Sequence, residues 1–72
     1  MVIKKLVEPE LNLYRSQCNF IGEEAEVFEM RSKGVGLEEI AERLEYSYDG
    51  IKKVSRTVDD KIRRVRNYFG TF

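Results

Sequence analysis

The sequence predicts an all-α fold built from four helices. Apolar residues recur every three or four positions through most of the chain, which is the spacing of one face of a helix. Glycines interrupt this pattern, and the only proline, Pro9, stands where a first helix would begin. The chain has 72 residues and neither internal repeats nor low-complexity segments, which predicts a single domain over residues 1–72.

The composition favours a water-soluble domain. Hydrophobic residues make up 42% and charged residues 36% of the chain, which is too apolar for disorder and too charged for a membrane protein. No apolar run approaches the ~20 residues that span a bilayer, and the first residues lack the apolar core of a signal peptide. We therefore expect a cytoplasmic protein with no membrane partner.

The reactive residue types argue against an enzyme. The chain has no histidine and one cysteine, Cys18, so neither a zinc site nor a Cys/His nucleophile pair is available. No carboxylates, lysines or tyrosines stand at a spacing that catalysis would demand. We expect no catalytic residue, no metal and no cofactor, and we interpret Cys18 as a small buried apolar residue of the first helix.

The first half of the chain predicts two helices and an N-terminal arm. Pro9 suits a first helical turn, and apolar residues then follow at helical spacing, which predicts a helix over residues 9–18. Residues 1–8 fit neither helical nor strand spacing, and they form either an added helical turn or an extended arm. A second helix is predicted over residues 23–33, because its first turn is acidic and Gly34 follows a cationic last turn.

The second half predicts a short helix and a long one. Residues 37–44 carry apolar side chains at i, i+3, i+4 and i+7, so this helix is amphipathic. Ser47 can cap a helix over residues 48–66 by accepting a hydrogen bond from a backbone N–H two or three residues on. The tail, residues 67–72, is aromatic, and it folds back on the core, meets another subunit or frays.

The spacing around Ser47 fits a helix-turn-helix, in which two short helices cross near right angles. Ala41 falls where the helices approach closely, and apolar residues occupy the positions that point inward. Glu45 departs from the pattern, because glycine usually supplies a positive φ there, and a non-glycine costs on the order of 1 kcal/mol. The residues assigned to the core of the motif are Leu37, Ile40, Ala41, Leu44, Tyr46, Ile51 and Val54.

Charge is divided unevenly along the chain, although the net charge is zero. Residues 1–45 hold six Lys and Arg against ten Asp and Glu, a net charge of −4, whereas residues 46–72 hold seven against three, a net charge of +4. The last helix is therefore the basic part of the molecule. The motif and the charge reversal fall on the same segment, which favours DNA binding.

The stretch from Glu24 to Val54, EAEVFEMRSKGVGLEEIAERLEYSYDGIKKV, resembles region four of bacterial sigma factors and the similar domains of quorum-type response regulators. The resemblance covers roughly residues 20–66 and is most specific over residues 37–44. It implies a bacterial or phage protein whose capped helix reads promoter DNA in the major groove. With the capping serine included, the DNA-binding set that it implies is Ser47, Tyr48, Asp49, Lys52, Lys53 and Arg56.

The side chains at these positions have suitable chemistry. Lysine and arginine can donate to guanine O6 and N7, aspartate can accept from cytosine N4, and tyrosine can reach a phosphate or a thymine methyl. Asp49 has an alternative role as a charge favoured at a helix N-terminus. Gly50 stands where the family more often has a side chain, so either the backbone comes very close to DNA or one contact is missing. Asp59 and Asp60 would repel a phosphate, so we expect the contacting surface to end near Arg56.

Two functions of different classes follow. The first is a transcription regulator or sigma-like factor that binds a specific duplex site, with RNA polymerase or a second copy of the chain as candidate partners. The alternative is a protein interaction adaptor of the same fold that does not bind DNA and docks a basic partner through its acidic helices, which the zero net charge favours. Farther along the last helix, four cations either touch phosphates or keep the outer face soluble: Lys61, Arg63, Arg64 and Arg66.

Overall fold

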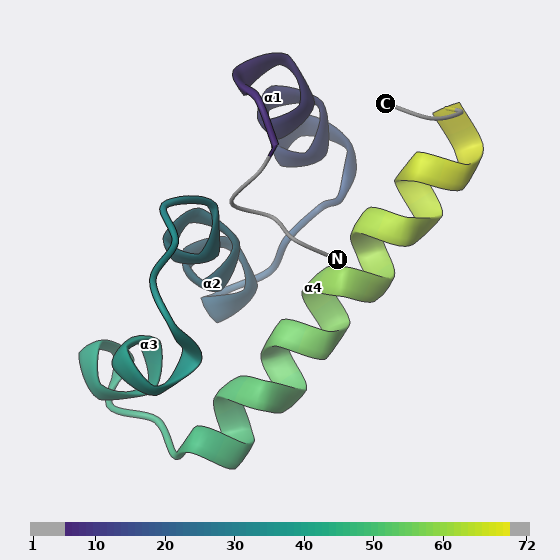
Figure 1. Ribbon diagram of the computed structural model, residues 1–72. Helices are drawn as coiled ribbons and strands as arrows, with labels where there is room; N and C mark the ends of the chain where they lie inside the picture. Colours follow the sequence, from purple (N-terminus) through teal and green to yellow (C-terminus); the bar gives the residue numbers. More distant parts are fainter. Residues whose placement is uncertain (1–5, 70–72) are drawn as a thin grey trace.

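Four helices and their connections make up residues 6–69, the part of the chain that the computed structural model describes (Figure 1). The helices are α1 (Glu8–Gln17), α2 (Glu23–Ser32), α3 (Leu37–Leu44) and α4 (Tyr48–Phe69). No strand occurs within the described residues. The all-α, four-helix fold predicted from the sequence is therefore confirmed.

Helix α4 is the axis on which the other helices are arranged. Its 22 residues span about 33 Å at 1.5 Å per residue, close to the 34 Å long dimension of the molecule. Each of the other helices contacts α4, and in Figure 1 they follow one another along it, from α3 at its N-terminal end to α1 near its C-terminal end. Neither α4 nor any other helix in residues 6–69 is long and apolar enough to cross a membrane.

The helix bounds differ from the predicted ones mainly at the end of α4. The predicted ranges of α1 and α2 agree with the structure to within one residue at each end. Helix α4 continues to Phe69, three residues beyond the predicted end, because no glycine or proline follows Gly50 before residue 70. The first part of the predicted tail is therefore helical. Residues 1–5 of the predicted arm and 70–72 of the predicted tail lie outside the described residues.

Gly34 ends α2, as the sequence predicted. Its φ is 85°, in the left-handed region that glycine enters without strain. The Val35 N–H donates to the Met30 carbonyl and the Gly34 N–H to the Arg31 carbonyl, both at 3.0 Å. These are the paired bonds of a Schellman motif, which satisfies carbonyls at the helix end. The chain thus turns directly from α2 toward α3.

The core lies between α4 and the three helices packed on it. Every helix contributes a fully buried side chain, and the largest include Tyr14, Phe28, Ile40 and Ile62. The ring of Phe20, in the connection between α1 and α2, packs on Phe28 with a centroid distance of 4.8 Å. Because all four helices share this core, the rotation of α4 about its own axis is set by packing.

Cys18 follows α1 directly and is buried, as its interpretation as a small apolar residue predicted. Burial raises the pKa of its thiol to about 11, and the nearby Lys61 ammonium opposes this effect only in part. The nucleophilic thiolate is therefore scarce at neutral pH.

Candidate nucleic-acid interface

A three-residue turn joins α3 to α4, and Glu45 reverses the chain direction within it. The Glu45 backbone is left-handed, with φ 57° and ψ 41°, where the motif usually has glycine. The Glu45 N–H donates to the Glu42 carbonyl at 3.3 Å, and the Tyr46 N–H donates to the Ala41 carbonyl at 2.9 Å. The turn is therefore also a Schellman motif. Its left-handed glutamate costs on the order of 1 kcal/mol relative to glycine.

The prediction that Tyr46 lies in the core is wrong. Its side chain is 42% exposed, and its hydroxyl donates a hydrogen bond to the carboxylate of Glu23 at the start of α2. This hydrogen bond lowers the pKa of Glu23 and raises that of Tyr46. At this exposed position the tyrosine satisfies its polar hydroxyl with a carboxylate of another helix. Tyr46 thus ties the turn to α2 from outside the core.

The other predicted core positions of the motif face inward. The buried side chains are Ile40, Ala41 and Ile51, with Leu37, Leu44 and Val54 partly buried against the core. Apolar packing therefore occupies the inner side of the α3–α4 pair, and the outer side of α4 is left to polar residues.

Ser47 caps α4, as predicted. Its Oγ accepts a hydrogen bond from the Gly50 N–H at 3.0 Å, which satisfies a donor that has no partner within the helix. Gly50 lies tightly against this cap, because a Cβ there would be 3.0 Å from Ser47 Oγ and 3.7 Å from Cδ2 of Tyr46. Crowding against the cap is therefore a reason within the protein itself for glycine at this position. It stands beside the two interpretations drawn from the resemblance, a close approach of the backbone to DNA or a missing contact.

The predicted DNA-contacting side chains gather on the first three turns of α4 and are exposed to solvent. Lys52, Lys53 and Arg56 are exposed, and no carboxylate within residues 6–69 lies at ion-pair distance from any of them. The Lys52 Nζ lies 5.5 Å from the centroid of the Tyr48 ring, a cation–π distance. Tyr48 and Asp49 are also exposed. Three cations of α4 are thus available to an external anion.

These side chains form one exposed arc of α4, of which one edge borders a hollow. Lys52 and Arg56 are one turn apart and line a hollow between α2, α3 and α4. Asp49 and Lys53 are also one turn apart, and their positions on the helix are opposite the buried side that contains Ile51. The candidate interface therefore has an outer face, formed by Asp49 and Lys53, and a recessed side at the hollow.

Cations farther along α4 are partly occupied by carboxylates of the chain itself. The Lys61 Nζ pairs with the carboxylate of Glu24 and also donates to the Asn19 carbonyl at 3.0 Å. The hydrogen bond from Lys61 lowers the pKa of Glu24. Arg63 pairs with Asp60 at 3.3 Å in an exposed position. Lys61 thus has a third role beside the two expected for these cations, because it ties α4 to the start of α2 and to the connection that precedes it.

A partly buried polar cluster, which the sequence analysis missed, joins α2 to the middle of α4. The Arg31 Nη1 donates to Ser55 Oγ and to Asp59 Oδ1, each at 2.8 Å. Ser55 is buried, and the Arg31 side chain is only 15% exposed. Asp59, which interrupts the basic stripe of the sequence, is therefore the partner of Arg31. In the sequence, the only local sign of this cluster is that Ser55 and Asp59 stand one helical turn apart. Arg31 could not be connected to them, because it stands 28 residues before Asp59.

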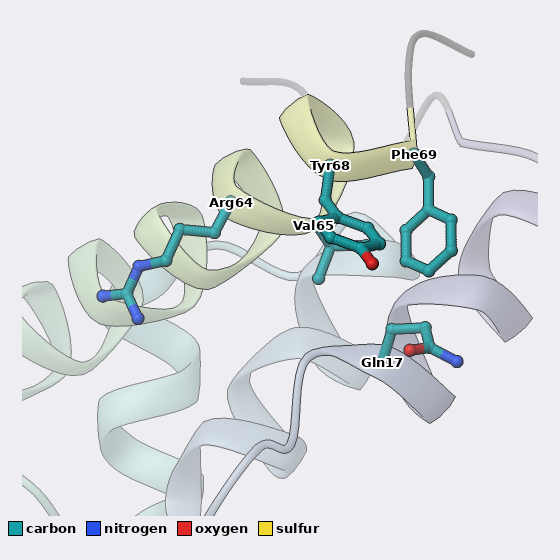
Figure 2. Close-up of a pocket in the computed structure, with 5 residues that line it drawn as sticks. All are labelled: Gln17, Arg64, Val65, Tyr68 and Phe69. Atoms are coloured by element: carbon teal, nitrogen blue, oxygen red, sulfur yellow. The ribbon is translucent and has the colours of Figure 1, made fainter.

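A separate hollow of about 470 Å³ lies at the other end of α4, lined by Gln17, Arg64, Val65, Tyr68 and Phe69. The side chains of Tyr68 and Phe69 are 83% and 50% exposed, and their rings meet edge to face with centroids 4.9 Å apart. Figure 2 shows both rings at the helix end near Gln17, with Arg64 extending away from them. We call this surface the aromatic end of α4.

Comparisons with known proteins do not assign the interface. A scan against protein-family models, a search of curated proteins and a search of solved structures each returned no match. Within residues 6–69, no three side chains of His, Cys, Asp or Glu are grouped so that they could hold a metal ion. The geometry and charge of α3, α4 and the turn between them are therefore the observations that bear on a nucleic-acid interface.

Proposed function

We propose that this protein binds a specific site on double-stranded DNA through α3 and α4, and that it regulates transcription as a helix-turn-helix or sigma-like factor. The observation that carries the proposal is the set of three exposed cations, Lys52, Lys53 and Arg56, without carboxylate partners among the described residues. They follow a capped helix start on the side of the molecule that the core leaves open. A helix fits the B-DNA major groove, which is about 12 Å wide.

In this proposal the outer face of α4 reads base edges. Lys53 can donate to guanine O6 and N7, and Asp49 can accept from cytosine N4. Tyr48 is exposed beside Lys52 and is suited to a phosphate or to the methyl group of thymine. The Ser47 cap holds the start of α4 in helical form, so these side chains are presented from a rigid backbone.

Salt-dependent binding to duplex DNA tests the proposal. Phosphate contacts by Lys52 and Arg56 would give a slope of log K against log salt of about −1.8, which is about a 12-fold loss of affinity from ~50 to ~200 mM salt. The double substitution Lys52→Glu and Arg56→Glu should weaken binding by roughly tenfold or more. Duplexes selected from a random pool with the parent protein supply the specific site.

The matched control is Arg63→Glu with Arg66→Glu, which makes the same change of charge at two exposed residues of the same helix, far from the turn and outside both hollows. We expect this control to bind within about twofold of the parent at ~150 mM salt, where exposed charges more than ~8 Å apart are largely screened. Thermal unfolding of both double variants verifies that they fold. If the folded Lys52→Glu, Arg56→Glu variant binds duplex as tightly as the parent, the proposal is wrong.

The adaptor role remains the alternative, and one observation favours it. Helix α3 exposes Glu38, Glu39 and Glu42, and only Glu39 is paired, with Arg43, among the described residues. An acidic surface of this kind complements a basic protein partner. Two results together would support the adaptor role instead. The parent protein would show no affinity for duplex DNA at low salt, and it would bind a basic partner that the Glu38→Lys, Glu42→Lys variant no longer binds.

For the partner we propose a second copy of the chain, with both copies acting in the cytoplasm. A single reader helix gains little affinity from one half-site, whereas a dimer engages two. The aromatic end of α4, with the exposed rings of Tyr68 and Phe69, is the candidate surface. The molar mass in solution, measured by light scattering for the parent and for Tyr68→Ser, tests this. If the parent protein is a monomer, RNA polymerase becomes the favoured partner for the aromatic end of α4.

A further inference from the structure

The hollow on the recessed side of α4 is built from three helices. It has a volume of about 300 Å³, and its lining residues are Arg31, Leu37, Lys52, Ser55, Arg56 and Asp59. One wall is the end of α2, a second is the first residue of α3, and the third is α4. Since liquid water occupies about 30 Å³ per molecule, the hollow has room for a phosphate group together with water.

The charges around the hollow are unbalanced. Three cations line it against one carboxylate, that of Asp59, and Arg31 already pairs with this carboxylate at 2.8 Å. Lys52 and Arg56 remain on the rim, one turn apart and without an ion pair in the described part of the chain. The hollow therefore carries a net charge of +2 that the protein itself does not neutralise.

Hydrogen bonds hold the base of the hollow in place, whereas the side chains of its rim are exposed to solvent. Hydrogen bonds to Ser55 Oγ and to the carboxylate of Asp59 fix the Arg31 guanidinium. This positive group therefore stays at the base of the hollow. The rim cations, Lys52 and Arg56, have long exposed side chains that can both reach a ligand in the hollow from α4. This arrangement of a fixed base and two exposed cations suits a compact anion with several acceptor oxygens.

We infer that the hollow between α2, α3 and α4 seats a phosphate group of the DNA backbone, held by Lys52 and Arg56 above the Arg31 cluster. The inference rests on the proposed function, and it gives two different roles to the residues proposed to contact DNA. Lys52 and Arg56 set the position of the protein on the duplex, and the outer face of Asp49 and Lys53 reads the bases. A free phosphate or phosphorylated small molecule offers the same chemistry, and the test separates these two sources.

The test compares duplex affinity over a series of salt concentrations for variants of the full chain. Lys52→Gln with Arg56→Gln removes both rim cations, so the slope of log K against log salt should become shallower by about 1.8, or 0.9 for each lost phosphate contact. Its loss of affinity should be uniform across duplex sequences. Lys53→Gln should instead change the preference among bases, and Arg63→Gln, at an exposed cation that lines neither hollow, should leave both the slope and the preference unchanged.

A titration with inorganic phosphate, followed by the backbone amide signals of Leu37, Ser55 and Arg56, provides the second measurement. Sequence-selective duplex binding with an unchanged slope in the rim variant would overturn the inference and leave the proposed function standing. A parent that binds no duplex would overturn the proposed function and the DNA assignment together. In that event, amide shifts caused by phosphate, and lost in the rim variant, would assign the hollow to a free ligand.

Discussion

The left-handed backbone at Glu45 predicts that glycine would stabilise this protein. The αL conformation costs an L-residue about 1 to 2 kcal/mol, and Glu45→Gly removes this cost. Glycine also makes the unfolded chain more flexible, which opposes the gain by about 0.5 to 1 kcal/mol. The net stabilisation should therefore be about 0.5 to 1 kcal/mol. For a domain of this size, the melting temperature should rise by about 4 °C in thermal unfolding followed by circular dichroism.

Glu42→Gly is the matched control, because it makes the same substitution on the exposed side of α3, in the interior of the helix. There the change should destabilise the protein by about 1 kcal/mol, since glycine is a poor helix former. Glu45→Gln, which removes the charge and keeps the Cβ, should stay within about 0.5 kcal/mol of the parent. A melting temperature that falls for Glu45→Gly as it does for Glu42→Gly would refute the left-handed turn.

Three further predictions concern two polar contacts between α2 and α4 and the burial of Cys18. Arg31→Met should lower the free energy of unfolding by about 2 kcal/mol in urea titration, because it leaves a buried hydroxyl and a half-buried carboxylate without their cation. Cys18 should react with a thiol reagent at pH 8 far more slowly in the native protein than in urea, since burial raises its pKa to about 11; equal rates would contradict the burial. The hydrogen bond from Lys61 makes the pKa of Glu24 lower in the folded protein than in the unfolded chain. The pair therefore stabilises the fold at pH values above the unfolded pKa of about 4.3, and this stabilisation is lost as the pH falls through the lower folded pKa. Melting temperatures from pH 7 to pH 2 should therefore fall less steeply for Glu24→Gln, and parallel curves would count against the pair.

The fold could be predicted from the sequence because its signals are local. Gly34 ends α2 and Ser47 caps α4 through bonds to residues within five positions, and such bonds depend on residue type and spacing alone. The apolar spacing of α3 and of α4 also located their buried sides. These features could be predicted without knowledge of how the helices pack.

The features that the sequence did not predict depend on tertiary structure. The position of Tyr46 follows from the direction in which the chain leaves the left-handed Glu45, and from a carboxylate 23 residues earlier in the chain. The Arg31 cluster joins residues 28 positions apart. The sequence placed Lys52, Lys53 and Arg56 in one DNA-binding set, whereas the packing of α2 and the start of α3 leaves Lys53 on the outer face and puts the other two cations at a hollow.

The length of α4 has a consequence for how this protein can change. Tyr48 and Tyr68 stand 20 residues apart on one continuous helix, which separates them by about 30 Å. Substitutions so far apart, with no shared neighbours, usually have additive effects on stability. Mutations that alter the surface near Tyr68 can therefore accumulate without disturbing the cationic turns, so the two ends are free to evolve independently on a common scaffold.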